Sequence, residues 1–242
     1  MGTSSSYSAP TSGGWPTAKG VATRFARQGG LSPGPSSVQP QQVTGAYVAA
    51  HGGATSAAAT AAFGQSAAQA LGGFYSGVAS GGLAAGLQQI GLGGLVGSDA
   101  MSLLSSLVDR LAGPGRTLDE ADARTAMLAV LQREFGDAET FSDLEALYAN
   151  GLDSDAVMGI TEQFIVEYIY ARMVQELGKQ LQDGALTTAD ACRVERDLQA
   201  FIAATVKLEM ARTDALTLEW NGPAGRQFIA GLLEAAYGQL GA

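Results

Sequence analysis

The chain opens with six residues that could undergo covalent chemistry: Met1, Gly2, Thr3, Ser4, Ser5 and Ser6. Removal of Met1 would expose the α-amine of Gly2, which has no Cβ and can therefore enter a narrow enzyme pocket. The hydroxyl groups that follow can hydrogen-bond along such a groove. An α-amine has a reference pKa of roughly 7.7–8.0, which makes it a better nucleophile at neutral pH than a lysine. Gly2 is therefore a candidate acceptor for a covalent modification.

The same terminus allows two other interpretations. Met1, Gly2 and Ser6 match the minimal N-myristoylation motif, Met-Gly-x-x-x-Ser. A single myristoyl chain binds membranes only marginally without a basic patch or a second lipid, and the first 18 residues contain no Lys or Arg. A flexible polar leader without a function would have the same composition. Modification, lipidation and a plain leader remain alternatives.

The rest of the chain offers few groups for catalysis. His51 is the only histidine and Cys192 the only cysteine, so zinc sites of the Cys/His type are excluded, and Glu-x-x-His pairs are absent. The glycine-rich stretch contains no Gly-x-x-x-x-Gly-Lys-Ser/Thr phosphate loop. We expect no catalytic residue, no metal and no cofactor. An enzyme would require His51 to lie in a cleft with a serine and a carboxylate.

Other potentially reactive side chains have ordinary structural interpretations. A free cysteine in a helical segment, such as Cys192, is usually a small buried hydrophobe. Glu162, Glu167 and Glu176 fall between apolar positions of a predicted helix, where we expect a solvated charged face.

Charge is distributed unevenly along the chain. Lys19, Arg24 and Arg27 are the only charged side chains before Asp99, whereas the remainder has 11 Lys and Arg against 23 Asp and Glu, so +3 and −12 give the net charge of −9. No predicted helix has the basic stripe that phosphate neutralisation needs, and we expect no direct nucleic-acid contact. A single cysteine and the absence of a basic-then-apolar leader favour the cytoplasm.

Residues 1–42 are predicted to be a disordered tail, because their Ser, Gly, Pro, Gln and Thr offer too few apolar groups to offset chain entropy. Two islands within it, one at Trp15-Pro16 and one at 21–27 around Phe25, resemble docking motifs with exposed aromatic anchors. The predicted partner-binding residues are Gly2, Thr3, Ser4, Ser5, Ser6, Tyr7, Trp15 and Phe25.

Residues 43–97 form a second segment, rich in Ala, Gly and Ser and without Asp, Glu, Lys or Arg. We expect Ala-rich helices near 44–63 and 65–80, followed by a loose glycine-rich connection. Small residues at four-residue spacing, as at Gly73, Gly77 and Gly81, would let helix backbones approach closely. The apolar run from 82 to 97 is too short to span a membrane.

Residues 98–242 read as an all-α, acidic helical bundle with clear helix boundaries and no alternating strand pattern. Ser98 is a candidate N-cap, Thr117 with Glu120 forms a capping box, and Thr187 or Thr188 caps a later helix. The expected helices span 98–111, 117–135, 142–149, 154–181, 187–212 and 223 onward, with the fourth as the central helix.

The opening residues, the Ser/Gly/Pro-rich leader, the Ala/Gly-rich middle and the acidic helical end together resemble the QatB family of the bacterial Qat anti-phage defence system. The opening Met-Gly-Thr-Ser-Ser-Ser is the most specific element of this resemblance, whereas the helical body is similar in layout.

This resemblance implies a non-enzymatic subunit that works beside an ATPase, a TatD-like nuclease and QatC, a homologue of the deazaguanine-forming synthase QueC. QueC-like enzymes activate a carboxylate with ATP and pass it to an amine. We hypothesise that the amine is the α-amino group of Gly2, to which QatC conjugates a deazaguanine. The alternative is a purely structural adaptor whose tail docks without covalent change.

Overall fold

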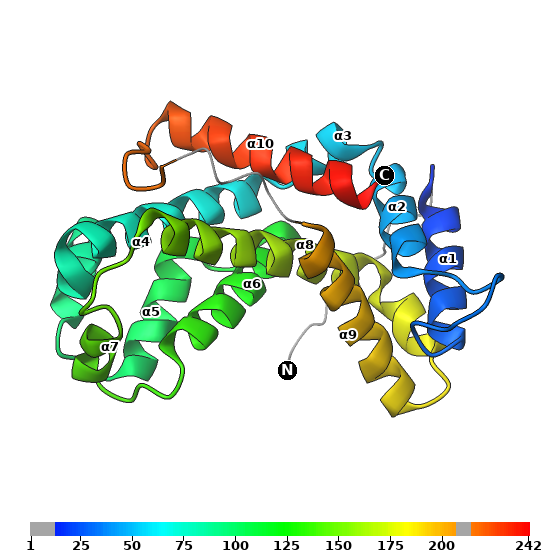
Figure 1. Ribbon diagram of the computed structural model, residues 1–242, viewed down its shortest axis with the longest axis horizontal. Helices are drawn as coiled ribbons and strands as arrows, with labels where there is room; N and C mark the ends of the chain where they lie inside the picture. The colour runs from blue at the N-terminus through cyan, green and yellow to red at the C-terminus, as the bar shows by residue number, and fades with distance from the viewer. Residues whose placement is uncertain (1–12, 207–213) are drawn as a thin grey trace.

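The computed structural model describes residues 13–206 and 214–242, and every regular element within them is helical (Figure 1). The predicted all-α class is therefore confirmed for the described residues. In chain order the elements are α1 (Trp15–Arg27), α2 (Pro40–Ala50), α3 (Ala54–Ala59), α4 (Ala62–Gln89), the 3₁₀ turn η1 (Gly93–Leu95), α5 (Ala100–Ala112), α6 (Leu118–Phe135), α7 (Phe141–Leu147), α8 (Ser154–Gly184), α9 (Thr188–Thr205) and α10 (Pro223–Leu240).

Helix α8 is the central element, as its long apolar stripe predicts. It has 31 residues, begins at the N-cap Asp153, and packs against α1, α4, α6 and α9. Its buried side chains include Phe164, Ile165, Ile169 and Met173, which recur at helical spacing. Because the other long helices pack on this one rod, residues far apart in sequence meet along it.

Side-chain caps fix where most of the later helices begin. Thr117, Thr140 and Thr187 each accept a hydrogen bond from the backbone N–H three residues ahead, which confirms the predicted N-caps at Thr117 and Thr187. The other half of the capping box predicted at Thr117 is not formed, because the Glu120 carboxylate accepts from the Arg116 N–H instead. The predicted cap at Ser98 is wrong, since Asp99 caps α5 by accepting from the Ser102 N–H at 2.8 Å. The helix expected over 187–212 ends at Thr205, and residues 207–213 lie outside the described part.

The prediction of a disordered tail is wrong for residues 13–42. Helix α1 packs along α8, and its buried positions recur every three or four residues: Trp15, Ala18, Val21, Ala22, Phe25 and Ala26. Trp15 is 6% exposed and Phe25 is 0% exposed, so both belong to the core and neither is an exposed docking anchor. The two helices can approach closely because Gly184 on α8 has no side chain. A Cβ added there would lie only 2.8 Å from Ala26 Cβ on α1. The prediction rested on the low apolar content of this segment. The few apolar residues are nevertheless enough to anchor a helix, because they all lie on one face of it.

The Ala/Gly-rich region folds differently from the expected pair of helices and loose connection. The first expected helix is divided between α2 and α3 at Gly52 and Gly53, where φ is +89° and +97°. Helix α4 continues to Gln89 through a kink at Gly82, with φ +79° and ψ 175°. After this kink the chain doubles back, so that a Cβ on Gly77 would lie 3.3 Å from Gly86 Cα. The predicted close backbone approach thus occurs between the two halves of α4.

Two glycines on α4 make room for large aromatic rings. A Cβ at Gly64 would overlap the ring of Tyr168 on α8, and one at Gly72 would overlap the indole of Trp220. Gln69 on the same helix donates a hydrogen bond to the Trp220 carbonyl. The small residues of α4 are therefore partners of specific aromatic side chains.

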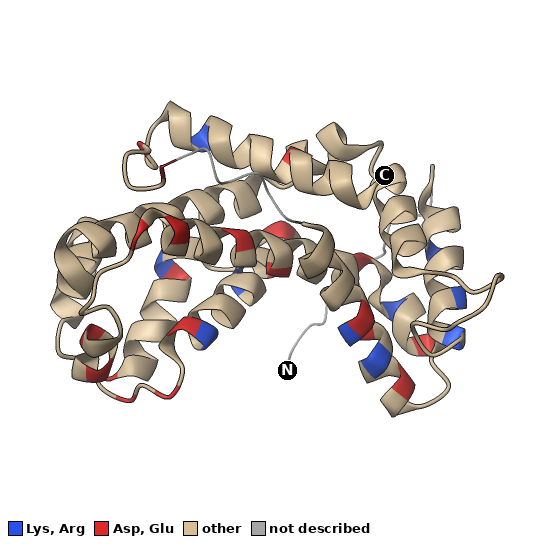
Figure 2. Cartoon of the chain, in the orientation of Figure 1, with Lys and Arg blue, Asp and Glu red and all other residues tan. Residues whose placement is uncertain are grey.

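One cluster of buried side chains includes residues from α1 through α10. Charged residues gather on α6, α8 and α9, whereas α2, α3 and α4 carry no Asp, Glu, Lys or Arg (Figure 2). No helix among the described residues is long and apolar enough to cross a membrane.

Replacing Gly72 with alanine tests the packing of α4 against Trp220. The added methyl group would overlap the indole, whose Nε1 donates to the Ala215 carbonyl at 2.8 Å, so we expect the free energy of unfolding to fall by about 1–3 kcal/mol. Gly231→Ala in α10 is the matched control, because no described atom lies within 4 Å of its added Cβ. That control should be neutral or stabilising by up to about 1 kcal/mol. Urea denaturation measures both, and equal effects would contradict this packing.

Candidate functional site

The base of the amino-terminal segment is held firmly against the body. Gly14 lies against α2, where an added Cβ would be 2.9 Å from Ala50 Cα. Trp15 meets Tyr47 and His51 edge-on, with ring centroids 6.0 Å and 5.1 Å apart. Residues 1–12, which include the predicted acceptor Gly2 and the predicted partner-binding residues Thr3, Ser4, Ser5, Ser6 and Tyr7, lie outside the described residues.

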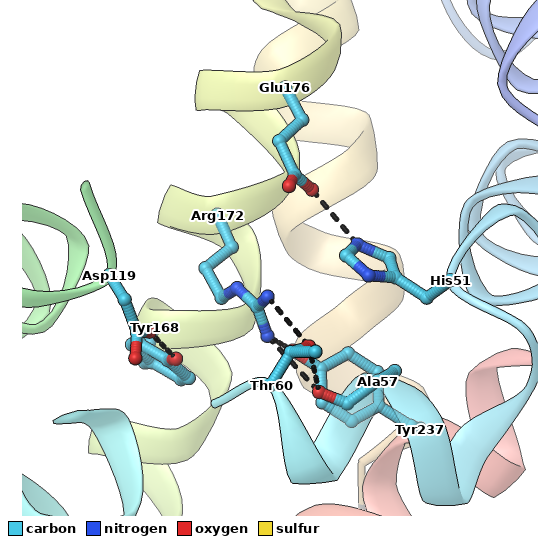
Figure 3. A network of polar contacts seen from close by, with 8 residues as sticks. All are labelled: His51, Ala57, Thr60, Asp119, Tyr168, Arg172, Glu176 and Tyr237. Atoms are coloured by element: carbon cyan, nitrogen blue, oxygen red, sulfur yellow. Dashed lines mark hydrogen bonds and ion pairs between the residues drawn. The ribbon is translucent and has the colours of Figure 1, made fainter. Parts of the chain in front are cut away.

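His51 belongs to this anchoring cluster. Its Nε2 lies 3.0 Å from Glu176 Oε2 on α8, and the two side chains are 9% and 11% exposed (Figure 3). The solvated face expected for Glu176 is therefore wrong, because its carboxylate is nearly buried against a ring that comes from 125 residues earlier in the chain. Among the described residues, the side-chain partner of His51 is this carboxylate, and no serine hydroxyl there hydrogen-bonds to the ring.

A buried arginine lies one turn before Glu176 on α8. The Arg172 guanidinium donates to the Ala57 carbonyl at 3.2 Å, to the Tyr237 hydroxyl at 3.1 Å and to Thr60 Oγ1 at 3.1 Å (Figure 3). Its Cζ also lies 5.8 Å from the centre of the Tyr168 ring, in a cation–π contact. Arg172 is only 6% exposed, so these contacts replace its lost hydration. This one side chain joins α8 to α3 and α10.

Tyr168 extends the network to α6 and α4. Its hydroxyl donates to Asp119 Oδ1, and Asp119 Oδ2 accepts from the Phe63 N–H at 2.9 Å. Asp119 lies in the first turn of α6, as expected for an acid at a helix N-terminus, and it also ties the start of α4 to α8.

Asp122 lies one turn further along α6 and is 6% exposed. Its Oδ2 has no hydrogen-bond partner among the described residues. Burial raises the pKa of Asp122 from 3.8 to about 7, while nearby Arg172 opposes the rise and Glu176 and Asp119 add to it. A carboxyl group that changes charge near neutral pH therefore lies close to the charged groups of the network.

A separate groove lies between α6 and α9, with α8 as its floor, and we call it the α8 groove. It has a volume of about 410 Å³ and is lined by Arg133, Glu162, Gln163, Val166, Glu167, Arg196, Gln199, Ala200 and Ala203. Glu167, expected on a solvated face, is 8% exposed and accepts hydrogen bonds from Arg133 and Gln199.

Metal-binding side chains do not converge in the part of the chain that the structure describes. No group of three or more His, Cys, Asp and Glu side chains there could hold a metal ion. Cys192 is exposed on α9, so the expectation that it is buried is wrong. Sequence reasoning also missed the Arg172 network, although a lone arginine inside the apolar stripe of α8 was a signal for it.

Comparison with known protein families places this chain in one of them. The family model described as QatB, Qat anti-phage system associated protein QatB, matches residues 52–240. No curated protein and no solved structure matches this chain. The match begins immediately after His51, so the segment that carries Gly2 and the whole of α1 precede it.

Removing the buried guanidinium tests whether Arg172 joins the helices. Arg172→Met keeps most of the side-chain volume but removes the donor shared by the Ala57 carbonyl on α3 and the Tyr237 hydroxyl on α10, and we expect a loss of about 3 kcal/mol or more in the free energy of unfolding. Arg226→Met, at an exposed arginine of α10, is the control and should stay within about 0.5 kcal/mol of the parent chain. Chemical denaturation measures both, and similar stabilities would contradict the role of Arg172.

The raised pKa of Asp122 makes stability depend on pH. Between pH 3.8 and about 7 the folded chain keeps a proton that the unfolded chain releases, so this group makes the free energy of unfolding fall as pH rises through that window. Asp122→Asn removes this dependence, and the variant should gain at least about 1 kcal/mol relative to the parent between pH 5 and pH 8. Urea denaturation at several pH values measures the difference. A difference that does not change with pH would mean that Asp122 is ionised throughout.

Proposed function

Since the chain belongs to the QatB family of Qat anti-phage system associated proteins, we propose that it is the subunit of this defence system that presents its own amino terminus for modification. In this proposal Met1 is removed, Gly2 is exposed, and the QueC-like partner QatC joins a deazaguanine to the Gly2 α-amine. The chain itself is the substrate and not the catalyst.

The chemistry requires an unprotonated amine that can enter another enzyme's active site. The Gly2 nitrogen attacks the carboxyl carbon that the partner has activated with ATP, an amide bond forms, the activating group departs and the amine loses a proton. Gly2 suits this role because it carries no Cβ and its α-amine has a reference pKa of roughly 7.7–8.0.

The anchoring of Trp15 supports the proposal, and it is the observation that carries it. With Trp15 fixed against Tyr47 and His51, Gly2 stands at the end of a short leader. Trp15 lies thirteen positions after Gly2, and a fully extended chain of that length spans roughly 45 Å. The acceptor can therefore enter a partner's active site while the helical body stays outside as a rigid platform.

A purely structural adaptor is the second candidate. The single buried cluster across α1 to α10 favours a binding protein of this kind, and the described residues contain no cluster of side chains that could hold a metal ion. The ATPase and the TatD-like nuclease of the system would then be further partners. The two candidates differ in one observable, which is covalent mass at the amino terminus.

The decisive experiment is the mass of the amino-terminal peptide from chain expressed with and without the QueC-like partner. We expect loss of Met1 and a mass gain on the peptide that begins at Gly2, only when the partner is present. Gly2→Leu should abolish the adduct, because the larger side chain blocks both the removal of Met1 and entry of the amine.

Thr11→Leu introduces a leucine in the same leader away from the acceptor, and it should leave the adduct unchanged. An adduct that survives in Gly2→Leu, or loss of Met1 without any mass gain beside an active partner, would favour the structural adaptor.

A further inference from the structure

The α8 groove is open because its two walls diverge. Helices α6 and α9 both pack on α8, and from there they extend to opposite sides (Figure 1). Between them a strip of α8, with Glu162, Gln163, Val166 and Glu167, lines the groove. This strip is part of the central helix, so the groove is formed in the chain without a partner.

The polar rim of the groove is held in place by its own hydrogen bonds. Arg133 donates to Gln163 Oε1 and to Glu167 Oε1, both at 3.0 Å, and Gln199 Nε2 donates to Glu167 Oε2 at 2.9 Å. The rim is therefore set before any ligand arrives, which lowers the entropy lost on binding.

Charge in the groove is balanced. Arg133 and Arg196 offset Glu162 and Glu167, and the apolar lining comes from Val166, Ala200 and Ala203. A highly charged ligand of either sign would meet like charges in the lining, either the arginines of the two walls or the glutamates of the floor, which disfavours such ligands. The groove instead suits an uncharged segment rich in hydrogen-bonding groups that also carries an apolar ring.

Residues 1–12 of this chain have that composition. They contain seven Ser and Thr hydroxyls, no charged side chain and a single aromatic residue, Tyr7. Their positive charge is the α-ammonium group, which the carboxylate of Glu162 on the groove lining would attract.

The segment is also long enough to reach the groove. Its base at Trp15 contacts His51, which pairs with Glu176, and Glu176 lies nine residues beyond Glu167 on α8. Nine helical residues correspond to roughly 14 Å along the axis. Twelve extended residues span roughly 40 Å, which covers this distance together with a path around a helix of 10–12 Å diameter.

We propose that the amino-terminal segment docks in the α8 groove of its own chain, with Tyr7 against the apolar strip and the amino terminus beside Glu162. In this docked form Gly2 is withheld from a modifying enzyme, and a partner must displace the segment to reach it. Docking follows from the groove and the segment, whereas the regulatory consequence rests on the proposed function.

Disulfide trapping in the full-length chain tests docking without any partner. In a Cys192→Ser background, Ser6→Cys is combined with Ala203→Cys on the groove wall or, as the matched control, with Ala235→Cys, which is exposed on α10. The end of α10 lies beside α2, since Thr44 Oγ1 donates to the Leu240 carbonyl, so the control position is also near the base of the segment.

We expect the intramolecular disulfide to form about tenfold faster with Ala203→Cys than with Ala235→Cys, because docking raises the local thiol concentration. Non-reducing electrophoresis and mass spectrometry measure the rates. Equal rates would overturn the proposal, and so would crosslinks found only between two molecules, which would assign the groove to a second copy.

A second variant separates docking from modification. Ala200→Trp fills the groove from an exposed position, so it should reduce the Ala203 crosslink to the control rate and increase the rate of Gly2 modification by the QueC-like partner. A fast crosslink in the parent chain without any adduct would leave docking intact and refute the proposed function. If Gly2 is modified at the same rate in Ala200→Trp as in the parent chain, docking does not withhold Gly2 and that part of the proposal is refuted.

Discussion

The burial of one cation governs how the helices of this chain are arranged. Arg172 sits in the middle of the central helix and is shielded from water, so its guanidinium must find acceptors in the protein. It finds them at the end of α3 and on α10, two helices that are far apart in sequence. The apolar stripe of α8 could bury many different helices, and the observed arrangement is one that also satisfies the arginine. A packing that left the guanidinium without acceptors would cost several kcal/mol, so the polar network disfavours such packings.

The glycines of the uncharged region serve the same arrangement. Gly64 leaves space for the ring of Tyr168, which in turn lies under Arg172 and donates to Asp119. A larger side chain at Gly64 would push α4 away from α8 and separate the tyrosine from its partners. The unusual composition of residues 43–97 is thus explained by close packing against aromatic and polar groups.

Local features of the sequence predicted much of the fold. The threonine caps, the stop at Gly136 and the length of α8 depend on neighbouring residues, and they were correctly expected. The contact between His51 and Glu176 joins residues 125 positions apart, and no local pattern encodes it. Helix α1 was missed for a related reason, because its six buried residues are too few to predict a helix until the surface of α8 that receives them is known.

The folding of α1 changes what a modifying partner has to recognise. A free tail of 42 residues would place Gly2 up to roughly 140 Å from the body, and an enzyme could bind the tail alone. With Trp15 anchored, the reach falls to roughly 45 Å, which is comparable to the diameter of a small protein. In the function proposed here, an enzyme that holds Gly2 in its active site lies within roughly 45 Å of Trp15. The surface around α1 and α2 then lies within reach of that enzyme, so the partner can recognise it together with the terminal peptide.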